Sequence, residues 1–230
     1  MSSFLKRVFG SGDETTDPNE REYEIRLVFA LGNPGQEYAG NRRNVGFWAV
    51  NRLAKKHHAD FGAKTGTYAL AEAQIGGRRV ALAKTRTFNN DSGKAIWALV
   101  NKLKIDHARE ILVVSDHLDL PSGKVRLRRN GSGGGQKGMA DIIRVLKSDD
   151  FPRVRVGIGR PVVRGEPTRE PEHVANWVLS DPYGEEKTVL DAGVDRAVEA
   201  IECAIVEGIE AAMNLYNHED GGALVDGSAE

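Results

Sequence analysis

Three polar side chains stand at the end of an apolar run of the sequence or in the turn that follows one, where a ligand site is expected. Asn33 follows the run 25–30, Asn90 follows a second run, and Asp116 ends a third. If these runs are parallel strands, their carboxyl ends meet at one edge of a sheet, which is where α/β proteins hold ligands. An amide side chain at such a turn can contact a ligand, and an acid at a strand end is a common catalytic carboxylate.

A glycine-rich segment, residues 130–138, follows a strand-like run with alternating basic residues. Arg126 and Arg128 share one face of that run, because side chains alternate along a strand. The loop then delivers backbone N–H groups to a helix that begins near Met139, and such an entrance attracts anions. A Walker motif is excluded, because it requires Gly at position 136 and Ser or Thr at position 138. A nucleotide-binding enzyme is therefore not supported.

The sequence carries no motif of a serine hydrolase or of a metal site. The sequence has no Gly-x-Ser-x-Gly motif, so a serine hydrolase of that type is not supported. It has no group of His, Cys and Asp with the spacing of metal ligands, so we expect neither a metal nor a cofactor. The single cysteine, Cys203, excludes an intramolecular disulfide and a cysteine-based metal site, which fits a reducing cytosol.

The length of 230 residues suits one domain. Composition predicts a disordered extension over residues 1–22, a folded domain over residues 23–218 and a disordered tail over residues 219–230. No apolar run approaches the length of a membrane span.

Strand-like and helix-like patterns alternate along the chain. The strand-like runs are 24–30, 67–75, 79–84, 110–115, 124–127 and 153–158. The helical patterns are 45–57, 92–103, 139–146 and a long one over 185–215. Two glycines between the second and third runs predict a hairpin. The sequence therefore predicts a single three-layer α/β domain, with a mixed twisted sheet and helices on both faces.

Five segments, in the same order, resemble the signatures of the bacterial-type peptidyl-tRNA hydrolase family. They are 32–47 (GNPGQEYAGNRRNVGF), 87–93 (TFNNDSG), 112–121 (LVVSDHLDLP), 129–138 (RNGSGGGQKG) and 151–161 (FPRVRVGIGRP). The segments after residue 174 resemble the C-terminal helices of the family. The resemblance covers residues 25–217 and implies the fold of that family.

The resemblance also implies an activity. In the family, a His oriented by an Asp activates water, which cleaves the ester between the peptide and the 3′ end of the tRNA. Asp116 matches that Asp, and four residues match substrate-binding positions: Asn33, Tyr38, Asn90 and Gln136. The resemblance thus implies a monomeric cytoplasmic hydrolase of translation and ribosome rescue, which recognises the 3′ end and acceptor stem of peptidyl-tRNA without a cofactor.

RNA contact must come from a local basic patch, because the net charge of the chain is −1. Four arginines on two strand-like runs match the tRNA-contacting region of the family and are candidates for phosphate contacts: Arg126, Arg128, Arg153 and Arg155. The alternative interpretation is that they are solvated strand charges.

Three positions depart from the family pattern. Arg43 stands where the family has the catalytic His, Gln136 replaces a second His, and Lys137 replaces an Asn that positions the attacking water. Arginine has no acceptor nitrogen and stays protonated, so Arg43 cannot be the base. It can form an ion pair with Asp116 in the space of the family's His–Asp pair. Lys137 and His117 are the candidates for a replacement base, although His117 directly follows Asp116 and should face the opposite way.

Two functions remain open at this stage. The first is a peptidyl-tRNA hydrolase whose activity is weak or lost because Arg43 replaces the base. The alternative is a non-catalytic protein of the same fold that binds tRNA or another structured RNA. Two neutral positions have become cationic, and added positive charge suits a phosphate backbone, which favours retained RNA binding.

Overall fold

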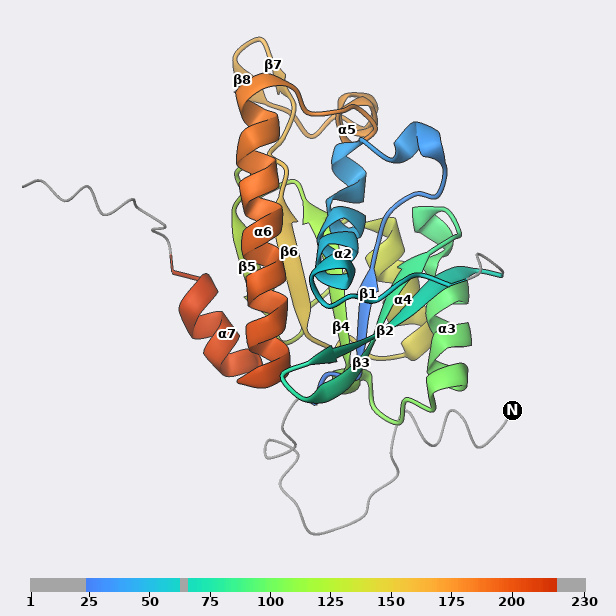
Figure 1. The fold of residues 1–230 in the computed structure, drawn as a ribbon. Helices are drawn as coiled ribbons and strands as arrows, with labels where there is room; N and C mark the ends of the chain where they lie inside the picture. The colour runs from blue at the N-terminus through green and yellow to red at the C-terminus, as the bar shows by residue number, and fades with distance from the viewer. Residues whose placement is uncertain (1–23, 63–65, 219–230) are drawn as a thin grey trace, which may run out of the picture.

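The computed structural model describes residues 24–62 and 66–218 of the chain (Figure 1). The extension predicted over residues 1–22 and the tail predicted over residues 219–230 lie outside the described residues. All of the described residues lie within the range 23–218 predicted for the folded domain.

The strands form one six-stranded sheet in the order β2-β3-β1-β4-β6-β5. Their bounds are β1 Leu27–Ala30, β2 Tyr68–Ile75, β3 Arg78–Thr85, β4 Ile111–His117, β5 Val125–Arg128 and β6 Arg153–Gly157. β1 pairs in parallel with β3 and β4, and β4 pairs in parallel with β6. The edge strands β2 and β5 run antiparallel to their neighbours. All four residues of β1 are buried, as expected for a strand covered on both faces.

Helices cover both faces of this sheet (Figure 1). Their bounds are α2 Val45–Lys56, α3 Ser92–Leu103, α4 Lys137–Leu146, α6 Gly184–Val206 and α7 Ile209–Tyr216. Val28 of β1 packs in the cluster with α2, α6 and α7, whereas Leu27 and Phe29 pack in the cluster with α3 and α4. This alternation is what a strand between two helical layers requires. The predicted three-layer α/β domain with a mixed sheet is confirmed.

The predicted long helix over 185–215 is wrong in one respect, because the structure divides it into α6 and α7. Gly208 lies between them with φ at 92°, a conformation that other residues rarely adopt and that ends a helix. The apolar spacing continues across the break, since Ile205, Ile209 and Ala212 all join the same buried cluster. The predicted hairpin between β2 and β3 is present.

A smaller group of elements lies beyond the end of the sheet where the chain leaves β1 for α2 (Figure 1). It consists of the two-stranded ladder of β7 (Val162–Val163) with β8 (Glu166–Pro167), and of α5 (Pro171–Val178). Pro171 opens α5, which is a position where proline's fixed φ and missing N–H are tolerated. These elements close one side of the candidate site.

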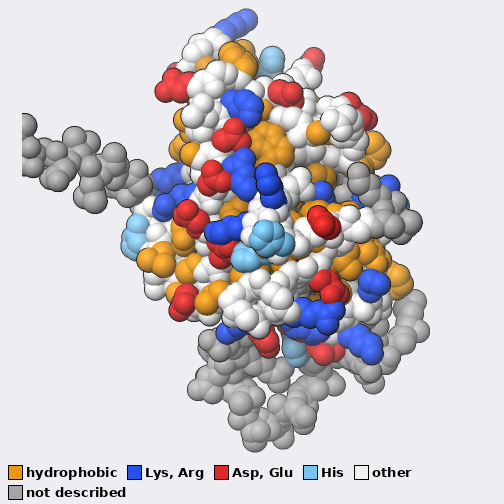
Figure 2. All heavy atoms as spheres, viewed as in Figure 1, with side chains coloured by type: hydrophobic (Ala, Val, Ile, Leu, Met, Phe, Trp, Pro, Cys, Tyr) orange, Lys and Arg blue, Asp and Glu red, His pale blue; other side chains and the backbone are white. Residues whose placement is uncertain are grey.

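The surface over α6 carries mixed charge (Figure 2). Ion pairs join α2 to α6 there, including Arg52 with Asp191 and Lys56 with Glu202. This face therefore presents no patch of a single sign. Among the described residues, no helix is both long and apolar enough to cross a membrane.

Candidate active site

A crevice of about 660 Å³ opens at the carboxyl ends of the central strands. It is lined by the turns that follow β1, β3 and β4, by the glycine-rich loop and by α5. The structure brings six of the residues chosen from the sequence into its lining: Asn33, Tyr38, Arg43, Asn90, Gln136 and Lys137. His117 lines it as well, whereas Asp116 is buried beneath it.

Arg43 and Asp116 form an ion pair at the base of this crevice. Arg43 belongs to the short 3₁₀ helix η2 (Arg42–Asn44), and Asp116 is the penultimate residue of β4. The Nη1 of Arg43 donates to both carboxylate oxygens of Asp116, at 2.9 Å and 2.7 Å. The Asp116 side chain is 1% exposed and that of Arg43 is 16% exposed. The ion pair expected from the sequence is therefore present, and it occupies both oxygens of the Asp116 carboxylate.

Gln136 holds the other side of Asp116, because its side-chain amide donates to the Asp116 backbone carbonyl. Gln136 precedes α4 directly, so this contact ties the glycine-rich loop to the end of β4. Lys137 is the first residue of α4, is exposed and lines the crevice. The two substitutions in the loop thus have different surroundings, one packed against the backbone and one open to solvent.

Asn44 orients Asn33 through reciprocal hydrogen bonds. The Oδ1 of Asn44 accepts the Asn33 N–H at 2.8 Å, and its Nδ2 donates to the carbonyls of Asn33 at 3.0 Å and Tyr38 at 2.7 Å. Asn33 in turn accepts the backbone N–H of Asn89 through Oδ1, at 3.0 Å. Asn44 is not among the site residues predicted from the sequence. Its position just before a predicted helix is the feature that could have indicated a structural role.

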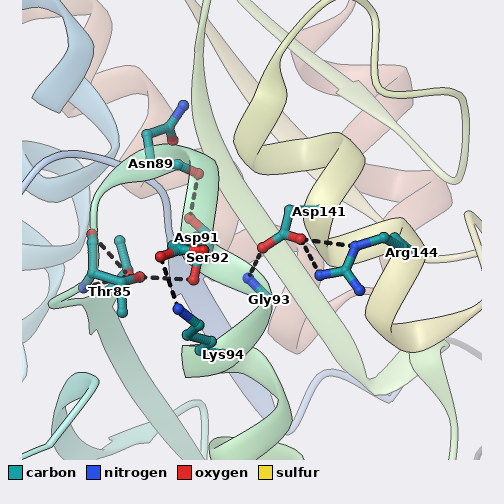
Figure 3. A network of polar contacts seen from close by, with 9 residues as sticks. Thr85, Asn89, Asp91, Ser92, Gly93, Lys94, Asp141 and Arg144 are labelled. Carbon is teal, nitrogen blue, oxygen red and sulfur yellow. Dashed lines mark hydrogen bonds and ion pairs between the residues drawn. The ribbon is translucent and has the colours of Figure 1, made fainter.

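The segment that carries Asn90 is fixed by polar contacts on both sides (Figure 3). Asn90 lies in the 3₁₀ helix η3 (Asn89–Asp91), immediately before α3. The hydroxyl of Ser92 donates to the Asn89 carbonyl at 2.8 Å, and the Gly93 N–H donates to Asp141 of α4 at 2.6 Å. These contacts couple η3 to the helix that begins with Lys137.

The same coupling depends on Gly138. A Cβ atom at Gly138 would lie 2.5 Å from the carbonyl oxygen of Asn89. The absence of a side chain therefore allows α4 to approach η3 closely. The side chain of Asn90 is exposed at the crevice, whereas its neighbours are held.

The glycine-rich loop is held by Arg153. Its guanidinium donates to the carbonyls of Ser132 at 2.6 Å, of Asp149 at 3.2 Å and of Gly131. Arg153 is 4% exposed, and this burial lowers its pKa to about 10. The guanidinium is thus committed to the loop, and we do not retain Arg153 among the phosphate contacts suggested by the sequence.

The other three arginines form an open basic face. In the ladder of β5 with β6, Arg126 stands opposite Arg155, and Arg128 stands opposite Arg153. Opposed residues of an antiparallel pair project from the same face, so the four side chains are neighbours. Burial lowers the pKa of Arg155, and the charges of Arg128 and Arg126 lower it further.

A second cavity of about 240 Å³ lies against this basic face. Arg128 and Arg155 line it together with the glycine-rich loop, and His117 and Gln136 separate it from the crevice. The Nε of Arg155 is buried and has no hydrogen-bond partner among the described residues. Guanidinium groups, an unused donor and loop N–H groups together suit a phosphate.

His117 forms no dyad with Asp116 in the described part of the chain, since Arg43 occupies the carboxylate. The His117 ring lies 3.2 Å from Arg155 Nη1 through Nε2, and 3.2 Å from the Asp119 N–H through Nδ1. Burial lowers the pKa of His117, and the charge of Arg155 lowers it further. The imidazole is therefore mainly neutral at neutral pH, and its one acceptor nitrogen faces one of these two donors.

Arg42 secures the α5 wall of the crevice. Its side chain is buried and donates to both carboxylate oxygens of Glu186, at 2.7 Å and 2.5 Å, and to the Ser180 carbonyl at 3.0 Å. Sequence reasoning did not single out this residue, because its partners lie more than 130 positions further along the chain. No group of three His, Cys, Asp or Glu residues within ranges 24–62 and 66–218 could hold a metal ion.

Comparisons with known proteins agree with this architecture. The family model described as "Peptidyl-tRNA hydrolase" matches residues 27–222. The peptidyl-tRNA hydrolase of Herpetosiphon aurantiacus is 47% identical over 193 residues, which cover 84% of this chain and 90% of the relative. That of Chloroflexus aggregans is 44% identical over 191 residues, covering 83% of this chain and 98% of the relative.

A solved structure gives the same result. The crystal structure of peptidyl-tRNA hydrolase from Acinetobacter baumannii superposes with a TM-score of 0.77 and 30% sequence identity, and the match covers 87% of this chain and 98% of that chain. The motifs, the three-layer fold and the sequence relatives all point the same way. The chain belongs to the peptidyl-tRNA hydrolase family.

Proposed function

We propose that this protein recognises peptidyl-tRNA and hydrolyses its ester bond only weakly. In this proposal the peptide and the 3′ end of the tRNA occupy the crevice, and the acceptor stem lies along the arginine face. The proposal places the protein in translation, as a monomer in the cytoplasm. Membership of the peptidyl-tRNA hydrolase family supports the substrate class.

The ion pair between Arg43 and Asp116 is the observation that supports weak hydrolysis. A hydrolytic water must lose a proton as it attacks, and general-base catalysis contributes a factor of about 10²–10⁴ to such a rate. Arg43 occupies the base position, and its Nη1 donates to both carboxylate oxygens of Asp116. A donor-only guanidinium cannot accept that proton.

Substrate recognition is supported by the groups that remain in the crevice. Asn33 and Asn90 present amides at its rim, and α5 contributes the apolar side chains of Val174 and Val178. Preorganised polar groups that stabilise a developing oxyanion sustain part of the rate without a base. For this reason we expect weak rather than absent hydrolysis.

RNA binding is supported by Arg126, Arg128 and Arg155. The first two lie on the edge strand β5, and Arg155 lies opposite Arg126 on β6. Cations with this spacing can neutralise successive phosphates, and phosphate contacts position an RNA without reading its sequence. Because the cavity beside them adjoins the crevice, one RNA end can occupy both sites.

The test is single-turnover cleavage of a purified N-acetyl-aminoacyl-tRNA by the native chain and by Arg43→His. We expect slow cleavage by the native chain and a rate increase of about 10²-fold or more in Arg43→His, because the base is restored. Arg43→Gln is the matched control, since it removes the ion pair without supplying a base. Rapid cleavage by the native chain would contradict the proposal and would direct attention to Lys137 and His117.

A second candidate function is a non-catalytic protein that binds tRNA or another structured RNA. The ion pair between Arg43 and Asp116 also favours this function, because it occupies the position of the base. The arginine face that would bind RNA does not depend on that base. This second function predicts tight tRNA binding by the native chain, with no cleavage by either the native chain or Arg43→His. A gel-shift titration run beside the cleavage assay distinguishes the two candidates.

A further inference from the structure

The crevice carries an excess of positive charge. One carboxylate lines it, that of Asp119, whereas four cationic side chains do so: Arg43, Lys137, Arg160 and Arg169. Arg160 donates to Asp119 at 2.6 Å, and Arg169 lies 3.9 Å from the same carboxylate. Even when the buried Asp116 is counted, cations outnumber acids at this site.

Two of these cations keep donors that face no acid. Arg43 uses only Nη1 toward Asp116, and its Nε and Nη2 have no partner among the described residues. The Arg43 side chain is 16% exposed and lines the crevice, so part of it is accessible there. Lys137 is exposed and forms no ion pair within the described part of the chain.

The rest of the crevice fits the end of a peptide. The apolar side chains of Val174, Ala175 and Val178 on α5 contribute to its lining, and so do Asn33 and Asn90. An ester or amide carbonyl is neutral, so it leaves the charge of Lys137 without a counterion, whereas the charge of Arg43 is already paired with Asp116. A carboxylate accepts charge-assisted hydrogen bonds from both, and these bonds are about twice as strong as neutral ones.

We propose that the crevice binds the free C-terminal carboxylate of a peptide between Arg43 and Lys137, in preference to the corresponding ester or amide. This inference rests on the proposed function, in which the crevice holds the peptide of a peptidyl-tRNA. The ligand it names is the released peptide rather than the ester. The protein therefore retains its peptide product, which adds to the slow turnover expected from the missing base.

The experiment compares two matched probes by isothermal titration calorimetry at pH 7, N-acetyl-dileucine as the free acid and as the C-terminal amide. We expect the native chain to bind the acid at least tenfold more tightly than the amide. In the double variant Arg43→His with Lys137→Asn, the preference for the acid over the amide should fall below about threefold. The double variant Arg78→Gln with Arg79→Gln is the charge-matched control, because both residues are exposed near the opposite end of β3.

Three results would overturn the inference. The first is equal binding of acid and amide by the native chain, in which case peptide recognition stands and the carboxylate subsite does not. The second is an acid preference that persists in the double variant. The third comes from a comparison of two acceptor-stem microhelices, one ending in a 3′-phosphate and one in a 3′-hydroxyl. If the native chain prefers the phosphate through Arg43 and Lys137 and shows no preference for the peptide acid, the subsite binds RNA. Cleavage of peptidyl-tRNA is not part of these measurements, so their failure is separate from failure of the proposed function.

Discussion

The guanidinium of Arg42 lies over the indole ring of Trp177, with 3.6 Å between its central carbon and the ring centre. Arg42 belongs to η2, which also carries Arg43, whereas Trp177 belongs to α5. Two consecutive arginines therefore reach in different directions, one to the wall of the crevice and one to its base. Loss of either contact should have separable effects on stability and on binding.

Replacement of Arg42 by Met should destabilise the protein. The substitution removes the charge paired with Glu186, whose side chain is 22% exposed, and it also removes donors to the Ser180 carbonyl. Breaking a buried pair on one side costs about 3–5 kcal/mol, and the partial exposure of Glu186 reduces this to about 2–3 kcal/mol. Urea denaturation measures the change in the free energy of unfolding.

Arg52→Met is the matched control for that prediction. Arg52 also joins two helices, α2 and α6, but its partners Asp191 and Asp195 are 40% and 64% exposed. Surface pairs contribute about 0–1 kcal/mol, so the control should change stability little. Similar losses in the two variants would contradict the role assigned to Arg42.

Replacement of Asn44 by Asp should weaken peptide binding in the crevice. Asp keeps an acceptor for the Asn33 N–H but loses the donors to the carbonyls of Asn33 and Tyr38. Leaving such buried groups unpaired costs about 1–3 kcal/mol, and the reoriented Asn33 should lower affinity for the N-acetyl-dileucine amide at least several-fold. Calorimetry with that peptide is the measurement. Asn51→Asp, at an exposed site outside the crevice, should bind it as the native chain does.

The stability of the protein should depend on pH through His117. Its pKa in the folded state is below the ordinary value of about 6.5, chiefly through burial and then through the charge of Arg155. The unfolded state therefore binds a proton more readily, and the stability that neutral His117 contributes above about pH 6.5 is lost as the pH falls. Asp119 and Asp116 act in the opposite direction, and Arg160 acts with Arg155.

The measurement is the free energy of unfolding of the native chain and of His117→Gln between pH 7.5 and 5. As the pH falls, the native chain should lose stability relative to His117→Gln, because only the native chain must protonate a buried imidazole. His58→Asn provides the control, because His58 is exposed and its left-handed backbone suits asparagine. Parallel curves for the native chain and His117→Gln would show that the lowered pKa has no effect on folding.

Local sequence pattern predicts the sheet, the helices and the meeting of Asn33 with Asn90, because parallel strands end at one edge. The pattern does not predict how deeply a side chain is buried. The alternation of Arg153 and Arg155 places them on one face of the strand, but only the packing shows that Arg153 is buried against the loop. Nor does the pattern predict the contact of Arg42 with Trp177, since nothing local connects residues so far apart. The break at Gly208 escapes periodicity because the apolar spacing continues across it.

The salt dependence of RNA binding should change when Arg155 is replaced. Arg155 stands opposite Arg126 and lines the cavity beside the glycine-rich loop, where a buried Nε has no partner among the described residues. Removing one phosphate contact reduces the slope of log affinity against log salt by about 0.9. Arg155→Gln should show this smaller slope in titrations of an acceptor-stem microhelix between about 50 and 200 mM salt. Arg79→Gln removes the same charge far from the arginine face and should keep the native slope, whereas an unchanged slope in Arg155→Gln would mean that the RNA does not reach this cavity.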